Sequence, residues 1–268
     1  MGIWVGIHSI GFVAACAVGL GVALAISFAL RNRGAAPVLM YHKIDAERRD
    51  RLTVSVAQLE QQLAWLAGHG YRTVTLREWS DRAAGRKGPN DRIVLLTFDD
   101  AYLTTLTLAL PVLQRFGMTA VLFVPSAFIG RTNEWDGGDE TLLDEEQLRQ
   151  LSPTVELALH SHRHPNYKYL SAEAIRADLA DNVAAMQATG LPYAPAFAFP
   201  YGGRPEDKAA SRAMRDALRQ AGITLAFRIG GRVNRIPLRN PYEVQRLDIN
   251  GTDSLRSFAR KVRWGKLP

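Results

Sequence analysis

The feature that most constrains the fold of this chain is the alternation of short apolar runs with longer amphipathic stretches. Several runs are apolar throughout, as in strands that a parallel sheet buries on both faces. The stretches between them repeat apolar residues at helical spacing, as at Leu59, Leu63 and Leu66. This alternation predicts an α/β fold with a parallel sheet, and eight strands favour closure into a barrel. The predicted strands are 37–42, 71–75, 92–98, 119–124, 155–160, 195–199, 224–229 and 244–249.

A second helix is predicted between Ser171 and Gly190. Ile175, Leu179 and Met186 recur at helical spacing. Serine often begins a helix and glycine often follows its end, so these two residues predict where the helix begins and ends.

The first 30 residues contain no Asp, Glu, Lys or Arg, and residues 10–30 are almost entirely apolar. As a helix this run would be roughly 31 Å long, which matches a hydrocarbon core. A cleaved signal peptide is the alternative, but it would usually have a basic start and a shorter apolar region. We therefore expect one transmembrane anchor. The expected divisions are a flank (1–9), the anchor (10–30), a linker (31–36), a globular α/β domain (37–255) and a basic tail (256–268).

Charge and cysteine content bear on location and partners. Arg31 and Arg33 follow the predicted anchor, which favours a cytoplasmic domain on a single-pass inner-membrane protein. The one cysteine, Cys16, lies inside the anchor, so cysteine usage does not decide the compartment. The net charge of +7 suits an anionic lipid or glycan surface as well as a generic basic surface. We expect no nucleic-acid partner.

Polar residues gather where four of the predicted strands end. Asp99 and Asp100 follow one strand, and His42 and His160 end two others. A Gly/Pro turn that contains Tyr201 follows the fourth. Each feature has a simpler interpretation, such as a helix cap for Asp100 or an ordinary tight turn. Because the carboxyl ends of parallel strands meet at one edge of the sheet, their coincidence favours a functional site.

The histidines point to a metal site. His160, His162 and His164 are three of the six histidines and lie within five positions. His160 and His164 with one carboxylate would form a set that binds Zn²⁺ or a similar divalent ion. Of two adjacent aspartates, one can bind the metal while the other takes a proton from water. A histidine across the site could protonate the leaving group, so the pattern predicts hydrolysis without naming the substrate.

Three motifs, TFDD at 97–100, HSxxH at 160–164 and FPYG at 199–202, resemble in this order those of the polysaccharide deacetylases. These are the NodB-like enzymes of carbohydrate esterase family four. PVLMYHKI at 37–44 is similar to the opening of a subgroup that includes poly-N-acetylglucosamine deacetylases. The resemblance covers about residues 36–255. It implies a distorted (β/α) barrel of about seven strands, the NodB homology domain, and metal-dependent removal of acetyl groups from the N-acetylated sugars of a glycan.

The resemblance also implies roles for individual residues. Asp99 is expected to be the catalytic base, and the cofactor is expected to be one divalent ion, usually Zn²⁺, with Co²⁺ and Ni²⁺ as alternatives. The backbone N–H of Tyr201 is expected to stabilise the oxyanion, and Pro200 to shape its turn. His162 falls on a variable position and is not assigned to the metal. The expected metal ligands are Asp100, His160 and His164.

Three positions depart from the family pattern. Ala101 stands where the family commonly has glycine, which is tolerable if the backbone there is not at positive φ. Ala198 stands where the family usually has an arginine that orients the base, and Arg246 is the expected substitute. No histidine follows His164, so the late histidine that supplies the acid in many members is missing. We expect His42 to supply it, as the resemblance to the biofilm-type subgroup implies for a residue of the first strand.

Other functions stay open at this stage. The same chemistry could act on a lipid-linked or intermediate sugar in the cytoplasm, which the arginines after the anchor favour. It could also act as an esterase on O-acetyl groups of a glycan. A non-catalytic glycan-binding homologue is favoured by Ala198 and opposed by the intact aspartates and histidines. The family resemblance places the catalytic domain in the periplasm or outside the cell.

Overall fold

The computed structural model describes residues 34–86 and 91–265 of the chain. The predicted anchor at 10–30 lies outside the described residues, as do the flank and most of the linker. Among the helices of the described residues, none is both long and apolar enough to cross a membrane.

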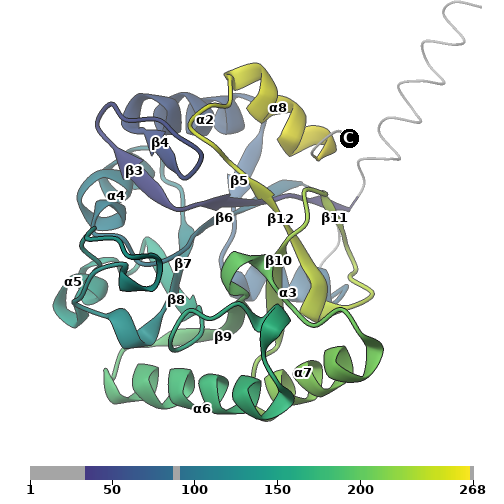
Figure 1. Cartoon of the computed structure of the whole chain (residues 1–268). Coiled ribbons are helices and arrows are strands. Elements are labelled where there is room, and N and C mark those ends of the chain that lie inside the picture. Colours follow the sequence, from purple (N-terminus) through teal and green to yellow (C-terminus); the bar gives the residue numbers. More distant parts are fainter. Residues whose placement is uncertain (1–33, 87–90, 266–268) are drawn as a thin grey trace, which may run out of the picture.

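Seven parallel strands close into a barrel, in the order β2-β12-β10-β9-β8-β7-β6, and β6 pairs with β2 to complete the ring. The predicted barrel of about seven strands is therefore confirmed (Figure 1). The eighth predicted strand, β5 (Tyr71–Thr73), pairs with the first three residues of β6, before the part of β6 that pairs with β2, and takes no part in closure. The barrel strands are β2 (Val38–Tyr41), β6 (Arg92–Phe98), β7 (Ala120–Val124), β8 (Val155–Leu159), β9 (Tyr193–Ala198), β10 (Leu225–Ile229) and β12 (Val244–Asp248).

Two short strand pairs flank the barrel. β1 (Ala35–Ala36) pairs antiparallel with β11 (Asn234–Arg235) at the end where the strands begin. β3 (Lys43–Asp45) pairs parallel with β4 (Thr53–Ser55) at the opposite end, directly after β2.

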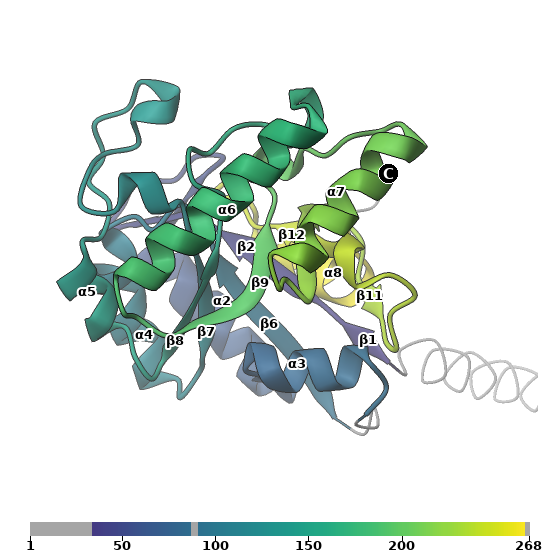
Figure 2. The same cartoon turned by 90° about the horizontal axis from the view of Figure 1, so that it is seen from below.

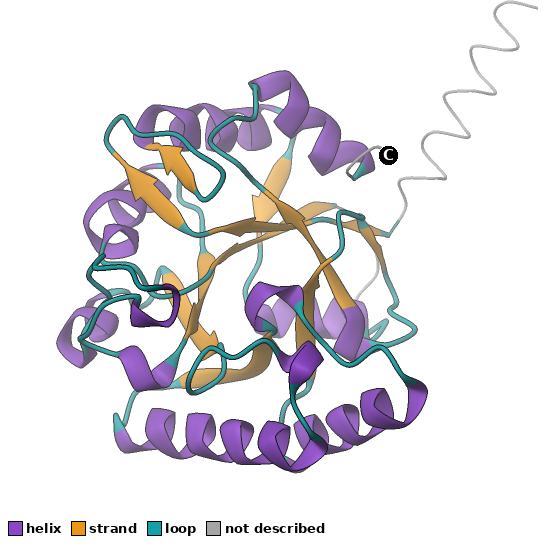
Figure 3. Cartoon of the chain, in the orientation of Figure 1, coloured by secondary structure: helices purple, strands orange, loops and turns teal. Residues whose placement is uncertain are grey.

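Helices surround the barrel on several sides (Figures 1 and 3). α2 and α8 lie together on one side, whereas α6 and α7 lie side by side on another, as Figure 2 also shows for the second pair. The helices are α2 (Val56–Gly68), α3 (Leu76–Ala83), α4 (Leu110–Arg115), α5 (Glu145–Gln150), α6 (Ala172–Ala188), α7 (Lys208–Gln220) and α8 (Leu255–Trp264).

The two helices predicted from periodicity are confirmed. In α2, Leu59, Leu63 and Leu66 are buried, because their spacing places them on one face against the barrel. Ser171 begins α6 as predicted, since its side chain accepts a hydrogen bond from the N–H of Ala174. The helix ends at Ala188, two residues before Gly190.

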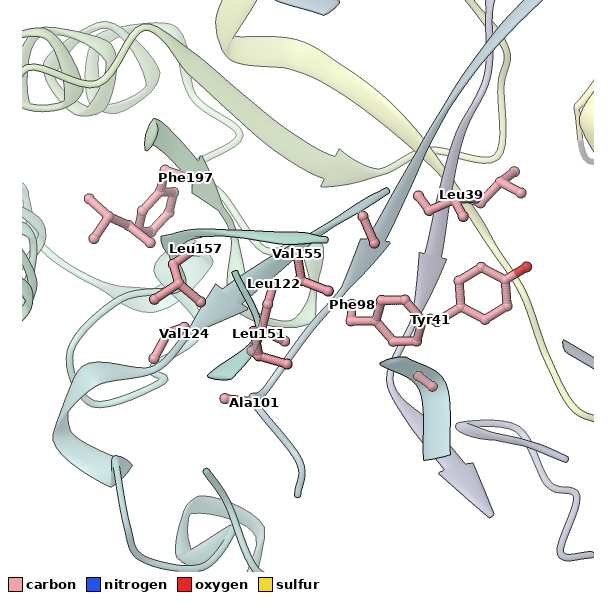
Figure 4. Packing of buried hydrophobic residues seen from close by; sticks show 14 of the residues in the cluster. Leu39, Tyr41, Phe98, Ala101, Leu122, Val124, Leu151, Val155, Leu157 and Phe197 are labelled. Carbon is pink, nitrogen blue, oxygen red and sulfur yellow. The ribbon is translucent and has the colours of Figure 1, made fainter. Parts of the chain in front are cut away.

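The core has two layers because successive residues of a strand point to opposite sides. Leu39, Tyr41 and Phe98 belong to the outer layer, in one cluster with buried residues of α2 and α4. The close view of Figure 4 shows these three side chains near one another. Inside the barrel, Phe227 lies 5.8 Å from the ring of Trp79 on α3. Trp79 is fully buried, so α3 contributes the side chain that fills the interior at the base of the barrel.

The basic segment at 256–268 is not a free tail over its described length. It forms α8, and Phe258 and Val262 on this helix are buried. The Phe258 ring meets Trp65 of α2 edge to face at 5.8 Å, and the Arg263 guanidinium lies 5.1 Å from the centre of the same indole. The helix therefore completes the hydrophobic packing around α2.

Candidate active site

The structure brings the predicted site residues to the carboxyl end of the barrel. Asp99 and Asp100 follow β6, His160 follows β8, and His42 follows β2. The turn η5 (Pro200–Gly202), which contains Tyr201, follows β9 one residue after its end. Arg246 comes from within β12 and points into the barrel below them. These residues meet at one end because all seven strands run in the same direction.

Asp100, His160 and His164 form one cluster of potential metal ligands. Asp100 Oδ1 lies 3.3 Å from His160 Nε2 and 3.2 Å from His164 Nε2. One ligand atom from each residue lies within 4.8 Å of the others, and all three residues are buried. Asp100 Oδ1 has no hydrogen-bond partner among the described residues. A buried oxygen without a partner, facing two imidazole nitrogens, fits a divalent ion such as Zn²⁺.

Two kinds of contact orient the imidazoles. His160 Nδ1 lies 2.8 Å from the carbonyl oxygen of Ala198, so this nitrogen carries the proton and Nε2 faces the cluster. The His164 ring is held by packing, because its centre lies 4.5 Å from the ring of Trp135 and 4.9 Å from that of Tyr201.

Asp99 is held by a buried arginine. Arg246 Nη1 donates to Asp99 Oδ1 at 2.6 Å and Nη2 donates to Oδ2 at 2.7 Å. Both residues are almost completely buried, and the guanidinium also lies 5.4 Å from the ring centre of Phe123. Arg246 thus makes the contact expected of the arginine that Ala198 replaces, from a strand two places away in the barrel.

Opposing effects set the pKa values of the carboxylates. Burial raises the pKa of Asp99, but the charges of Arg246 and His160 outweigh burial and lower it. Burial also raises the pKa of Asp100, and contacts with the two imidazoles bring it well below its usual range. His42 makes a further, smaller contribution that lowers the pKa of both carboxylates. Both aspartates are therefore ionised at neutral pH.

The backbone is strained at the same end of the barrel. A non-glycine residue at positive φ costs of order 1 kcal/mol or more and persists only where its surroundings fix it. Ala101 has a φ of 59°, so the condition under which alanine would be tolerated without strain at this position is not met. Among the described residues, all non-glycine residues at positive φ lie in the loops around this site: Asp100, Ala101, Ser161, His164 and Tyr201.

Two of the predicted residues are exposed at least in part. His42 is partly exposed, and Tyr201 is 54% exposed at the mouth of the barrel. Gly202 follows Tyr201 at a φ of 66°, and a Cβ there would lie 2.9 Å from the side chain of Ile229. The turn that carries the Tyr201 N–H is therefore packed tightly against β10, which leaves room only for glycine at this position.

His162 does not join the metal cluster. Its Nδ1 lies 3.0 Å from Ser126 Oγ, which in turn accepts a hydrogen bond from Asn182 of α6 at 2.8 Å. His162, which falls on a variable position of the family motif, therefore supports the loop from outside the metal cluster.

The sequence reasoning missed several residues that shape the site. Trp135 comes from a loop with no recognisable pattern, in the short helix η3 (Glu134–Asp136). Asp178 and Asn182 are different, because a signal existed for both. They lie on the buried face of α6 with Ile175 and Leu179, at helical spacing. Two polar residues inside an apolar stripe could have been recognised as buried partners of the active-site loop.

Comparisons with known proteins agree with this geometry. The model of the polysaccharide deacetylase family matches residues 86–226, slightly more than half of the chain. The YxkH protein of Bacillus subtilis is 31% identical over 147 residues, which cover 54% of this chain and 49% of that protein. The poly-beta-1,6-N-acetyl-D-glucosamine N-deacetylase of Escherichia coli K12 is 31% identical over 135 residues, 46% of this chain and 20% of that protein.

Solved structures extend the similarity over most of the barrel. IcaB from Ammonifex degensii superposes with a TM-score of 0.72 at 26% identity, covering 86% of this chain and 97% of that one. PplD from Streptococcus pyogenes gives the same TM-score at 18% identity, which shows the shared fold alone. The chain spans about half of YxkH and a fifth of the E. coli deacetylase. Because the family model covers more than half of it, the chain belongs to the polysaccharide deacetylase family.

Proposed function

We propose that this protein is a metal-dependent N-deacetylase that removes acetyl groups from the N-acetylated sugars of a glycan. One observation carries the proposal. Asp100 Oδ1, which has no hydrogen-bond partner in the described part of the chain, faces two histidine nitrogens. It lies directly beside Asp99, which Arg246 holds ionised. The names of the E. coli relative and of similar Staphylococcus proteins, all poly-beta-1,6-N-acetyl-D-glucosamine N-deacetylases, support the substrate class.

The metal would be held by Asp100, His160 and His164. When bound, a divalent ion supplies positive charge that polarises the acyl oxygen and makes water more acidic. The donor set of two imidazoles and one carboxylate leaves ligand positions open for water and substrate, and it suits Zn²⁺ best, with Co²⁺ and Ni²⁺ as alternatives.

The protein's own residues would move the protons. Asp99 accepts a proton from the attacking water, and Arg246 keeps its carboxylate ionised and correctly turned. The Tyr201 N–H donates a hydrogen bond to the acyl oxygen as it gains negative charge. His42, which is partly exposed, donates a proton to the departing amine. The products are acetate and a free amino group on the sugar.

The surroundings of the site suit a sugar. The rings of Trp135 and Tyr201 flank His164 from two sides, and Tyr201 is largely exposed. Aromatic faces beside a few fixed polar groups are typical of sites that bind a ring with both apolar and hydroxyl surfaces.

The location is part of the proposal. If residues 10–30 span a membrane, only residues 31–33 separate that span from Gly34, where the described structure begins at the base of the barrel. Gly34 lines a small cavity with three arginines, Arg82, Arg92 and Arg263, and one carboxylate, Asp91, so this base carries net positive charge suited to lipid headgroups. The catalytic mouth lies at the other end of the strands, roughly 23 Å away for the seven residues of β6. A glycan that extends away from the bilayer suits this arrangement better than a lipid-linked sugar does.

Acetate release tests the proposal directly. The full chain in detergent would be incubated with β-1,6-linked N-acetylglucosamine oligomers, with added Zn²⁺ or with a chelator, and with an O-acetylated glycan in parallel. We expect acetate from the N-acetylated oligomers only when metal is present. Release from the O-acetylated glycan alone would indicate an esterase instead. No release from either by folded, metal-loaded protein would contradict an enzymatic role on glycan polymers.

A further inference from the structure

A buried carboxylate on α6 holds the loop between the two histidines of the metal cluster. Asp178 is 9% exposed and accepts three hydrogen bonds. Its Oδ2 accepts from the backbone N–H of His162 at 3.1 Å and from the Tyr167 hydroxyl at 2.7 Å. Its Oδ1 accepts from the backbone N–H of Arg163 at 3.0 Å. The side chain therefore satisfies two consecutive backbone donors of this loop at once.

The loop needs such support because its conformation is costly. Ser161 and His164 both have positive φ, at 68° and 56°. Inside the loop, Ser161 Oγ accepts a hydrogen bond from the His164 N–H at 2.9 Å. This one internal bond fixes the two strained ends relative to each other, but it does not attach the loop to the rest of the fold. The Asp178 carboxylate attaches the loop to α6, a 17-residue helix packed on the barrel. This attachment adds to the hydrogen bonds that the N–H groups of Ser126 and Ala127 donate to the carbonyl oxygens of Ser161 and His162.

The geometry points to a defined role: we propose that Asp178 is a positioning residue for the metal site. It acts through the backbone of residues 162–163, which set the direction of the His164 imidazole relative to His160. Charge-assisted hydrogen bonds from a carboxylate to backbone N–H groups are about twice as strong as neutral ones, so a buried Asp suits this task better than Asn or Ser. The inference rests on the proposed function only in assuming that the cluster binds a divalent ion.

The test measures metal affinity rather than activity. The full-chain protein and its Asp178→Asn and Asp178→Ala variants would be titrated with Zn²⁺ against a competing chelator. We expect affinity to fall about 10- to 100-fold in Asp178→Ala, the range typical of residues that support metal ligands. The Zn²⁺ affinity of Asp178→Asn should lie between those of the unaltered protein and Asp178→Ala. The amide oxygen of Asn can still accept hydrogen bonds, whereas its amide nitrogen can only donate them. Asp181→Ala is the matched control, since Asp181 is exposed on the same helix.

A second variant covers the case in which Asp178→Ala fails to fold. Tyr167→Phe removes one of the three hydrogen bonds and keeps the ring, so it should fold and weaken metal binding by a smaller factor. High metal concentration should restore acetate release in the folded variants, which a merely structural defect would not allow. Unchanged metal affinity in folded Asp178→Asn and Tyr167→Phe would overturn the inference. Absence of metal binding by the unaltered protein would instead contradict the proposed function.

Discussion

At the scale of single residues, the Asp99–Arg246 pair makes a prediction about pH. Asp99 can accept a proton only when it is ionised, and Arg246 is a principal cause of its lowered pKa. Replacing Arg246 by Met removes that charge while burial remains, so the pKa of Asp99 should rise. As the solution is acidified, the rate of acetate release by the Arg246→Met variant should then begin to fall at a higher pH than that of the unaltered protein. A pH profile of acetate release measures this shift.

Arg246→Lys serves as the control for the pH prediction. It keeps a positive charge but cannot make both hydrogen bonds, so its profile should lie between those of the other two proteins. If a folded Arg246→Met variant lost activity at the same acidic pH as the unaltered protein, Arg246 would not set the pKa of Asp99.

His42 makes a separate prediction, because it lies outside the metal cluster. His42→Ala should lower turnover by about 10²- to 10⁴-fold, the usual contribution of a general acid, and leave metal content unchanged. Turnover and bound metal would be measured on the same preparation. Loss of metal together with modest loss of turnover would make His42 a ligand or a structural residue instead.

How far the sequence predicts the site depends on what each residue does. Residues whose chemistry is read directly from a motif, such as Asp99 and Asp100, could be placed at one edge from strand order alone. Arg246 could be named only as a substitute for Ala198, because nothing local shows that its side chain reaches Asp99. Trp135 could not be found, since it reaches His164 through a loop whose path no periodic pattern encodes.

At the scale of elements, α8 makes a prediction about stability. Phe258 is fully buried against Trp65, so Phe258→Ala should lower the free energy of unfolding by about 3–5 kcal/mol. Arg256→Ala on the exposed face of the same helix should change it by less than about 0.5 kcal/mol. Denaturant unfolding of both variants measures the difference. If both substitutions changed the free energy of unfolding by the same small amount, α8 would not unfold cooperatively with the rest of the protein.

Several strands were predictable because parallel strands buried on both faces are apolar throughout, and all eight predicted strands lie where they were expected. That β5 stays outside the barrel was not predictable, since closure depends on which edges meet and not on the composition of one strand. The packing of α8 against the rest of the fold was not predicted, because its many arginines are typical of an exposed tail. Phe258 and Val262, four residues apart, nevertheless give this helix a buried face.

At the scale of the whole molecule, the predicted anchor at residues 10–30 makes a prediction about location. With residues 10–30 as an anchor, a reporter fused to the carboxyl terminus should give a periplasmic readout, as the family resemblance implies. The same fusion lacking residues 10–30 is the control and should give a cytoplasmic one. A cytoplasmic readout from the full chain would agree instead with the arginines at 31 and 33 and would favour an intracellular sugar substrate.

The central claim is the division of labour between two adjacent aspartates, one a base and the other a metal ligand. The most direct test measures bound Zn²⁺ and acetate release together in Asp99→Asn and Asp100→Asn. We predict that Asp99→Asn keeps about one metal per chain and loses about 10²- to 10⁴-fold in rate, whereas Asp100→Asn loses metal and activity together. Metal lost from Asp99→Asn but retained by Asp100→Asn, or full activity in Asp99→Asn, would contradict this account.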